Sequence, residues 1–283
     1  SKSGLLTAIY TCAMAVFAGL AAGLSLPLAQ NLSWGWQNTF AFWGILTVVA
    51  ILFLWPCVKA EKNNREETPQ QPTNQKKAAS VYRSTLAWQI TLFMGLQSLL
   101  YYTLVTWLPN ICENYGATAA DASILALLLQ IISIPSSFLA PIWCDRAKDQ
   151  RKITFGFLLL YLIGMLLFLI PGHRFLLYCS VILLALGSGS TISLALSYMT
   201  LRTRDAQTAA EVSGMSQAVG YLLAGIGPAC AGFLFDMTHS WSIPILLMAL
   251  GVVLLMIFGN RAAKANQWIG EEKTGHTKPI KKN

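Results

Sequence analysis

Polar side chains recur at helical spacing inside the long apolar stretches of this sequence. Gln97 and Tyr101 are four residues apart, and Tyr102 lies on the neighbouring stripe of the same segment. Residues four apart share one face of a helix, so these side chains form one polar and aromatic arc. Glutamine and tyrosine side chains both donate and accept hydrogen bonds. The arc is therefore a candidate surface for hydrogen bonding to a small solute.

The same pattern occurs in three later segments, centred on Gln130, Thr191 and Gln217. Each such residue can either line a cavity or form a hydrogen bond between two helices, which contributes about 0.6 kcal/mol. A cavity role is favoured for Gln97, Tyr101 and Gln217. Serine and threonine hydroxyls often bond to the backbone of their own helix, which makes them weaker candidates. The full set of candidate cavity residues is Gln97, Tyr101, Tyr102, Gln130, Thr191, Gln217 and Tyr221.

The sequence lacks the usual patterns of catalytic and metal-binding residues. It contains no HExxH, GxSxG, Walker or kinase motif. The three histidines, His173, His239 and His276, fall in predicted loops or in the tail, and the six cysteines show no CxxC spacing. Cysteine within an apolar stretch behaves as a small hydrophobic residue. We therefore expect no enzymatic activity, no metal site and no cofactor.

The elements that hold these residues are too apolar for a soluble domain. Of the 283 residues, 55% are hydrophobic and 11% are charged, whereas soluble proteins carry about 25% charged residues. A helix that crosses a bilayer needs about 20 predominantly apolar residues. This composition excludes a soluble enzyme, a nucleic-acid-binding protein and a secreted disulfide-rich protein. The charge-free stretches predict eight spans of an all-α polytopic membrane protein, near residues 4–29, 37–57, 86–110, 119–142, 153–171, 175–200, 208–234 and 240–260.

The positions of the basic residues predict the orientation of these spans. Of the 20 lysines and arginines, 19 lie before the first span, in alternate loops or in the tail, and Arg174 is the exception. Basic residues accumulate on the cytoplasmic side of membrane proteins. Both termini of this chain and the loop 59–85 are thus predicted to be cytoplasmic, which requires an even number of spans. The net charge of +8 then reflects topology rather than binding to nucleic acid.

The distribution of polar residues divides the chain into four parts. Residues 1–58 hold two spans, 59–85 form a polar cytoplasmic linker, 86–262 hold six spans, and 263–283 form a cytoplasmic tail. Among the six later spans, two polar-rich helices and one plain helix follow each other, twice. Helices that face lipid must be apolar, whereas helices that line an aqueous cavity can carry polar groups. The order therefore predicts two inverted three-helix repeats, an arrangement found in secondary transporters.

Glu211 lies inside the predicted span 208–234. An acidic residue within a span can couple transport to protons. However, Thr208 and Glu211 have the spacing of a capping box, in which the threonine caps a helix and the glutamate bonds back to it. Thr118 and Asp121 repeat this spacing before the fourth span. The capping interpretation is favoured, and it leaves the six-helix half without an ionisable group at mid-membrane depth.

Two segments carry a resemblance to a known family. The first runs from Gly95 to Pro109 as GLQSLLYYTLVTWLP, and the second from Ala210 to Pro228 as AEVSGMSQAVGYLLAGIGP. Both resemble signatures of the major facilitator superfamily and, within it, of the cyanate/nitroimidazole transporter family. The resemblance implies a helical bundle whose eight spans correspond to helices 5 to 12 of a twelve-helix transporter. It also implies that the first four helices are missing from the given sequence.

A loop motif of the same superfamily is partly matched at residues 144–152. Asp145, Arg146, Arg151 and Lys152 occupy its acidic and basic positions, but its glycines are absent. The resemblance implies an ionic latch on the cytoplasmic side. The alternative is that these residues follow only the positive-inside rule, and the sequence leaves both interpretations open.

The resemblance further implies secondary transport of a small polar or anionic solute, such as a cyanate-like or nitroimidazole-like compound, by alternating access. The expected partners are this solute and the lipid bilayer, without nucleic acid, and a monomer in the cell inner membrane is expected. The alternative is a structural or accessory membrane subunit, or a truncated transporter without activity.

Overall fold

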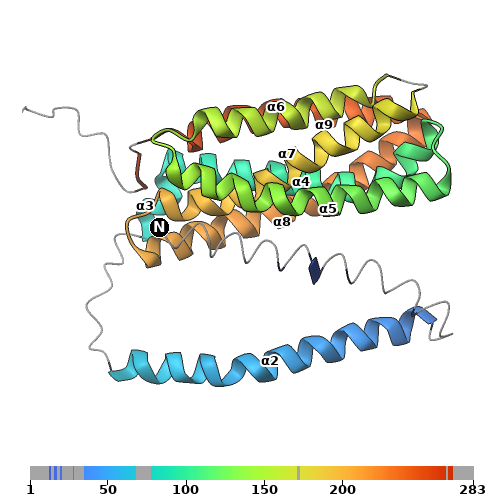
Figure 1. The fold of residues 1–283 in the computed structure, drawn as a ribbon. Coiled ribbons are helices and arrows are strands. Elements are labelled where there is room, and N and C mark those ends of the chain that lie inside the picture. Colours follow the sequence, from blue (N-terminus) through green and yellow to red (C-terminus); the bar gives the residue numbers. More distant parts are fainter. Residues whose placement is uncertain are drawn as a thin grey trace, which may run out of the picture. The chain divides into compact units, whose positions relative to one another are not determined.

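The computed structural model divides the chain into two compact units, and each is described by itself. It describes residues 13, 16, 17, 20, 28, 35–67, 78–170, 173–265 and 267–269. Unit 2 comprises Met14–Gln75, and unit 1 comprises Ser1–Ala13 together with Lys76–Asn283. Every secondary-structure element in the described residues is a helix (Figure 1), which confirms the predicted all-α class. The predicted first span, 4–29, falls almost entirely outside the described residues.

Unit 2 contains the long helix α2, Gly35–Glu67. Its consecutive residues Ile51, Leu52 and Phe53 are all exposed, so apolar side chains point in several directions around the helix axis. Such a surface is typical of a membrane span. The helix contains the predicted span 37–57 and continues to Glu67, beyond the predicted start of the linker at residue 59. Lysine, arginine and glutamate favour helix, so a polar segment can extend a helix without burying a core.

Unit 1 contains one short helix and six long ones. Each long helix coincides with one predicted span, although α6 ends at Leu167 rather than at residue 171 and α9 begins at Ser242 rather than at residue 240. The elements are α3 (Ala78–Arg83), α4 (Thr85–Asn114), α5 (Ala119–Arg146), α6 (Arg151–Leu167), α7 (Arg174–Leu201), α8 (Ala206–Thr238) and α9 (Ser242–Ala262).

The start of α5 is fixed by the predicted capping box. The Thr118 hydroxyl accepts a hydrogen bond from the backbone N–H of Asp121, and the Asp121 carboxylate accepts one from the backbone N–H of Thr118. These bonds satisfy two of the donors that a helix leaves free at its N-terminus.

The predicted capping box at the start of α8 is wrong. The helix begins at Ala206, and Asp205 caps it by accepting hydrogen bonds from the backbone and the side chain of Thr208. The carboxylate of Asp205 binds the free donors of the first turn, so the helix begins before Thr208. Glu211 therefore lies in the second turn of α8, where its carboxylate accepts a hydrogen bond from Gln207.

Six helices among the described residues are long and apolar enough to cross a membrane. They are residues Gly35–Phe53 of α2, together with α4, α5, α7, α8 and α9. α6 has 17 residues, which lies at the lower end of the length that a bilayer requires. These seven helices coincide with seven of the eight predicted spans.

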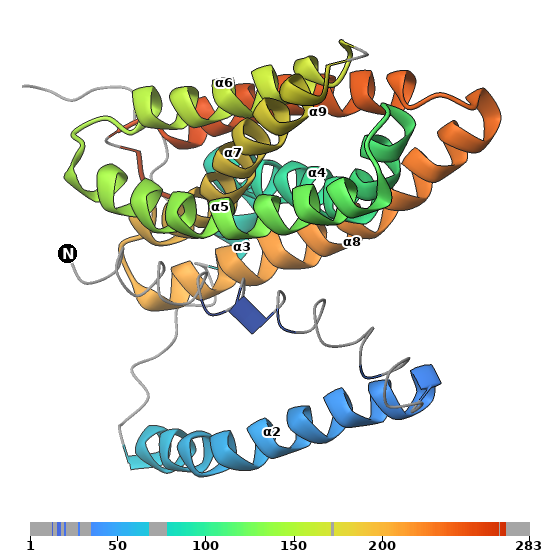
Figure 2. The ribbon, with the colours of Figure 1, turned by 45° about the vertical axis from the view of Figure 1, so that its right-hand side comes forward.

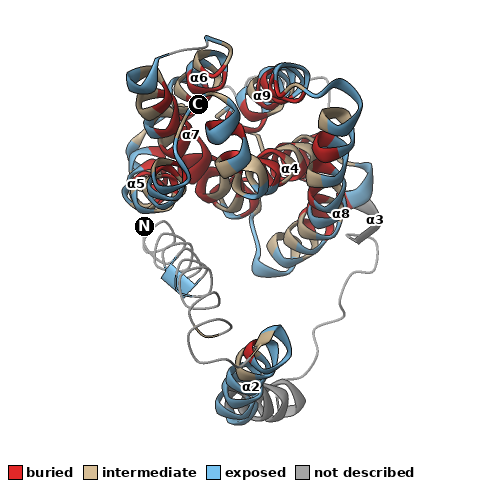
Figure 3. Ribbon diagram, turned by 90° about the vertical axis from the view of Figure 1, so that its right-hand side faces the viewer, coloured by how far each residue is buried: buried red, intermediate tan, exposed pale blue. Residues whose placement is uncertain are grey.

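The six long helices of unit 1 form two rows of three. In one row α7 packs between α5 and α6, and in the other α4 packs between α8 and α9 (Figure 3). The rows meet where α4 contacts α7 and α5, and where α6 contacts α9. In contrast, α5 and α8 have no extensive contact with each other. The buried residues lie on the inward faces of the helices, most densely on α4 and α7 (Figure 3).

The contacts in unit 1 agree with the predicted inverted repeat. If α4, α5 and α6 are exchanged with α7, α8 and α9, the α5–α7 contact becomes the α8–α4 contact, and the α6–α7 contact becomes the α9–α4 contact. The two plain helices, α6 and α9, lie side by side and away from α5 and α8 (Figure 2). Each row combines helices from both repeats, so each repeat buries its apolar surface against the other.

Glycine residues allow close crossings within each row. A Cβ atom on Gly189 of α7 would lie 2.3 Å from the carbonyl oxygen of Ser133 on α5. A Cβ atom on Gly227 of α8 would lie 2.3 Å from the hydroxyl of Thr103 on α4. Small residues permit such an approach of helix backbones in a membrane. The α5–α7 and α4–α8 crossings therefore set the shape of the two rows.

Candidate functional site

The structure brings Tyr101 of α4 together with Gln130 of α5. The Tyr101 hydroxyl donates a hydrogen bond of 3.2 Å to Oε1 of Gln130, and both side chains are half-buried. The bond joins a helix of one row to a helix of the other. These two candidates, 29 residues apart in the sequence, thus form a common polar site.

Aromatic contacts extend this site to α8. The Tyr102 ring lies 5.5 Å from the Tyr101 ring and 6.5 Å from the Tyr221 ring, both in edge-to-face geometry. This geometry is favourable for aromatic pairs. Tyr102 and Tyr221 are 41% and 44% exposed in the described structure, so their rings are accessible. We call the four residues Gln130, Tyr101, Tyr102 and Tyr221 the tyrosine cluster.

Gln97 lies one turn before Tyr101 on α4 and is buried, with 1% of its surface exposed. Its Nε2 donates to the hydroxyl of Ser98 at 2.9 Å and to the sulfur of Met94 at 3.4 Å. Its Oε1 is buried and accepts no hydrogen bond. A buried acceptor without a donor costs about 1–3 kcal/mol. Gln97 therefore has unused hydrogen-bonding capacity next to the tyrosine cluster.

The hydrogen bonds of Thr191 and Gln217 stay within their own helices. The Thr191 hydroxyl is buried in α7 and donates to the carbonyl of Ser188 at 2.8 Å. The Gln217 amide donates to the hydroxyl of Ser213 at 2.8 Å, one turn before Tyr221 on α8. Serine and threonine hydroxyls often donate a hydrogen bond to a backbone carbonyl of their own helix. The structure therefore brings four of the seven predicted residues into one cluster, places Gln97 beside it and gives Thr191 and Gln217 partners elsewhere.

Charged side chains are confined to the ends of the helices around this cluster. In α4, α5, α7 and α8 they all lie within the first or last two turns, at Glu113, Asp121, Asp145, Arg146, Arg174, Glu211 and Asp236. The described residues also bring together no group of histidine, cysteine and acidic side chains that could hold a metal ion. What this part of the chain offers a solute is therefore hydroxyl, amide and aromatic surface.

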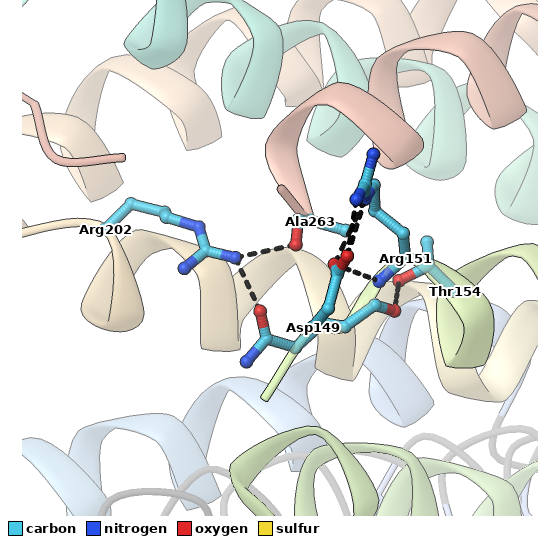
Figure 4. A network of polar contacts seen from close by, with 6 residues as sticks. Asp149, Arg151, Thr154, Arg202 and Ala263 are labelled. Carbon is cyan, nitrogen blue, oxygen red and sulfur yellow. Dashed lines mark hydrogen bonds and ion pairs between the residues drawn. The ribbon is translucent and has the colours of Figure 1, made fainter. Parts of the chain in front are cut away.

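One end of unit 1, formed by the α5–α6 loop, the α7–α8 loop and the end of α9, carries the predicted latch residues. We call it the basic end. Arg151, the first residue of α6, pairs with Asp149 in the loop before it, with 2.6 Å between Nη2 and Oδ2 (Figure 4). The hydrogen bond from Arg151 holds the pKa of Asp149 below its ordinary value. Asp145 is half-buried, and Arg146 and Lys152 are exposed.

A buried arginine that sequence reasoning missed lies at the same end. Arg202 is 5% exposed. Its guanidinium donates to the carbonyl of Ala263 and to Oε1 of Gln150, at 2.9 and 2.7 Å (Figure 4). From the sequence alone, Arg202 was only one of the basic residues near the ends of spans that predict their orientation in the membrane. The available signal was weak: Arg202 follows an apolar helix directly, one turn after Tyr198.

The opposite end of unit 1 holds a second ion pair. Arg174, at the start of α7, pairs with Asp121 at the start of α5. Tyr178 donates a further hydrogen bond of 3.3 Å to the same carboxylate. Arg174 is the single basic residue that departs from the alternating pattern of the loops, and its charge is balanced here by Asp121.

Comparison with known proteins agrees with this architecture. The family model described as Major Facilitator Superfamily matches residues 1–228. The chain is 40% identical over 272 residues to the uncharacterized transporter YycB of Bacillus subtilis (strain 168), covering 96% of this chain and 66% of the relative. It is 36% identical over 256 residues to the 2-nitroimidazole transporter of Escherichia coli (strain K12), covering 90% of this chain and 63% of the relative.

Two further comparisons extend this result. The cyanate transport protein CynX of Escherichia coli (strain K12) is 28% identical over 263 residues, covering 93% of this chain and 66% of the relative. The crystal structure of a variant of the E. coli fucose:proton symporter FucP matches with a TM-score of 0.56 and 14% identity, over 70% of this chain and 48% of the other. The last match shows the fold alone. The chain spans just under two thirds of the length of its three relatives, from 63% to 66%.

The fold and the cluster define a multi-pass helical membrane protein that places polar and aromatic groups between packed helices. The chain belongs to the major facilitator superfamily, because the family model matches more than half of its residues. It resembles relatives named as transporters of a nitroimidazole and of cyanate over most of its length.

Proposed function

We propose that the protein containing this chain is a secondary transporter of the cell inner membrane. A small solute would bind between its two halves, which rock to expose it to each side in turn. The observation that carries the proposal is the tyrosine cluster, where α4, α5 and α8 direct tyrosine and glutamine side chains toward one another. Family membership supports the transport class.

The solute that fits this site is small and polar or weakly anionic. The relatives named for 2-nitroimidazole and cyanate transport support this class. The cluster would hold such a solute by contact with tyrosine rings and by hydrogen bonds from hydroxyl and amide groups. Gln97 would contribute its free Oε1 as an acceptor. Because the surrounding helices carry charges only near their ends, binding would depend on dipoles rather than on an ion pair.

The basic end of unit 1 would face the cytoplasm, and both termini of this chain would lie on the same side. The positive-inside distribution of 19 of the 20 basic residues supports this orientation. The pairing of Arg174 with Asp121 supports it as well, because a neutralised arginine opposes translocation less than a free one.

Uptake by proteoliposomes tests the function. The purified protein is placed in vesicles. To test exit, the vesicles are loaded with 2-nitroimidazole or cyanate and diluted; to test entry, the same solute is added outside. The Tyr101→Phe variant removes the hydroxyl that bonds Gln130, and we expect its kcat/KM for uptake to fall about tenfold. Tyr82→Phe is the matched control, because Tyr82 is exposed on α3. Absence of movement of either solute in both directions would favour the accessory-subunit alternative.

A further inference from the structure

Arg202 is a buried cation held by dipoles of the backbone and of a side-chain amide. Its Nε donates to the carbonyl of Ala262 at 2.9 Å, and its Nη2 donates to the carbonyl of Ala263 and to Oε1 of Gln150 at 2.9 and 2.7 Å. Burial lowers the pKa of the guanidinium from its ordinary value, but arginine stays protonated in proteins. A buried charge needs such partners, since removal from water is costly.

The two carbonyls belong to the end of α9. The last carbonyls of a helix have no partner within the helix, and they form the negative end of its dipole. α9 does not end in a left-handed glycine cap, because Ala263 keeps a helical φ of −75°. Arg202, which follows α7 directly, therefore caps α9 from a different helix. This contact joins the ends of two helices from the same repeat.

Gln150 extends the network to α5 and α6. Its Nε2 donates to the carbonyls of Cys144 and Ala147 at 3.3 and 3.1 Å, at the end of α5. Its backbone carbonyl accepts a hydrogen bond of 2.9 Å from the hydroxyl of Thr154, in the first turn of α6. Both Gln150 and Thr154 are buried. One glutamine thus connects the end of α5, the start of α6 and, through Arg202, the end of α9.

Tyr198 closes this network into a ring. The Tyr198 hydroxyl bonds to the hydroxyl of Thr154. The guanidinium carbon of Arg202 lies 5.8 Å from the centre of the Tyr198 aromatic ring. A guanidinium at this distance is attracted by the face of an aromatic ring. The ring of contacts runs from Arg202 through Gln150, Thr154 and Tyr198 back to Arg202, and all four side chains are buried.

The segment that follows α9 is attached to the same arginine. The backbone N–H of Ile269 donates to the carbonyl of Arg202 at 2.9 Å. The guanidinium carbon of Arg204 lies 5.2 Å from the centre of the Trp268 ring. Residues 267–269 therefore return to the α7–α8 loop and cover the end of the network.

We propose that Arg202 is a positioning residue that clamps the basic end of unit 1, so that α5, α6, α7, α9 and the segment after α9 stay together as one rigid piece. Rigid-body movement of a helical half is what alternating access requires, and for that consequence alone the inference rests on the proposed function. The exposed pair of Arg151 and Asp149 cannot serve in this way, because it joins only the first residue of α6 to the loop directly before it.

The accessibility of two native thiols tests the clamp. Cys144 is buried at the basic end and its carbonyl accepts a hydrogen bond from Gln150, whereas Cys112 is equally buried near the end of α4, at the opposite end of unit 1. The protein in vesicles is treated with N-ethylmaleimide, and modification of each cysteine is measured by mass spectrometry of its peptide. Global unfolding exposes both thiols, whereas loss of the clamp exposes Cys144 alone.

We expect Arg202→Met to raise the labelling rate of Cys144 about tenfold and to leave that of Cys112 unchanged, since the local opening becomes more frequent. Arg202→Lys retains the charge but lacks the planar fork that reaches three acceptors, so it should give an intermediate rate. Arg261→Met is the matched control, because Arg261 is exposed at the end of α9.

Several outcomes would overturn the clamp. One is unchanged labelling of Cys144 in Arg202→Met, and another is a parallel increase at Cys112. If Arg202→Met fails to fold, Gln150→Leu provides the same test. This variant removes the side-chain acceptor of Arg202 and both hydrogen bonds that Gln150 donates to the end of α5, and it leaves Arg202 in place. A response confined to Cys144, in a protein that moves no solute, would support the clamp and reject the transport function separately.

Discussion

The α5–α7 and α4–α8 contacts are counterparts in the two repeats, but different groups hold them together. Across α5–α7, Ser136 and Ser137 donate hydrogen bonds of 2.5 and 2.7 Å to backbone carbonyls of α7. Across α4–α8, the hydroxyls of Thr91 and Ser216 bond to each other at 3.0 Å. In addition, Nε1 of Trp107 on α4 donates to the backbone carbonyl of Pro228 on α8 at 2.9 Å. The α5–α7 contact is therefore held at two backbone carbonyls, whereas the α4–α8 contact combines one such bond with a bond between side chains that can change rotamer.

The middle of the two contacts differs as well. At α5–α7, the backbone of Gly189 lies directly against the backbone of Ser133. At α4–α8, Gly95 and Gly220 face each other with ordinary van der Waals spacing, since a Cβ on either would lie 3.7 Å from the Cα of the other. We infer that α5–α7 is held more rigidly, and we call it the fixed contact. The α4–α8 contact, which carries Tyr102 and Tyr221, has more freedom to shift, and we call it the adjustable contact.

The strongest test of the fixed contact is Gly189→Ala. The new Cβ would lie 2.3 Å from a backbone oxygen of α5, which cannot move without displacing the helix. We expect a loss of about 3 kcal/mol of unfolding free energy, at the upper end for overpacking, measured by thermal unfolding in detergent. Gly214→Ala is the control, because no atom lies within 4 Å of its Cβ position. Equal unfolding midpoints for the two variants would contradict a fixed contact.

For Gly227→Ala in the adjustable contact we expect a smaller loss of unfolding free energy, part of which a second substitution should restore. The nearest obstacle to its Cβ is the side-chain hydroxyl of Thr103 at 2.3 Å, and the next is the carbonyl of Leu99 at 2.9 Å. We expect a loss of about 2 kcal/mol. The double variant Gly227→Ala/Thr103→Ala should recover part of it, which a double-mutant cycle of unfolding free energies measures. Strict additivity of the two changes would show that the backbone, and not Thr103, sets the cost.

Single hydrogen bonds across the fixed contact should have smaller effects. Ser137→Ala removes the bond to the carbonyl of Gly189, and Ser190→Ala removes a bond of 2.8 Å that stays within α7. Bonds between helices in membranes contribute about 0.6 kcal/mol. We expect Ser137→Ala to lower the unfolding free energy by about this amount relative to Ser190→Ala. The reverse order would show that the hydroxyls do not hold the helices together.

The smallest effect is expected for the exposed pair at the basic end. Its pKa shift means that Asp149 is stabilised as the anion by Arg151. The contribution of the pair to the unfolding free energy is therefore complete above the ordinary pKa of aspartate. It is lost as the pH falls through the lowered pKa of Asp149. Asp149→Asn should leave the unfolding midpoint at pH 7 unchanged, because exposed pairs contribute little. A clear drop at pH 7 that disappears at low pH would assign the pair a larger role.

The helices could be predicted from sequence because the signals that define them are local. Charge-free stretches of sufficient length identify spans, and seven of the eight coincide with helices in the described residues. Their ends were less predictable, since neighbouring residues compete for the free donors of a helix. Thr118 caps α5 as expected, whereas Asp205 takes that role at α8 in place of Thr208.

The candidate site was only partly predictable. Helical spacing identified Tyr101 and Gln130 separately, but their hydrogen bond joins two helices from different rows. Which face of each helix meets another depends on how all six pack, and a spacing rule for one helix contains no such information. The burial of Arg202 was missed for the same reason, because its acceptors, Ala262 and Ala263, lie 60 and 61 residues away.

The sequence by itself determined that this chain is a helical membrane protein, how its basic residues are distributed and which segments carry polar side chains. These properties follow from the free energy of placing individual residues in lipid, which depends on composition and local spacing. The tertiary structure decided which polar residues meet, since the crossing of α4 with α5 and α8 assembles the tyrosine cluster. It also decided that Arg202 is a buried cap for α9, because only the packed bundle brings the end of α9 within reach of that guanidinium.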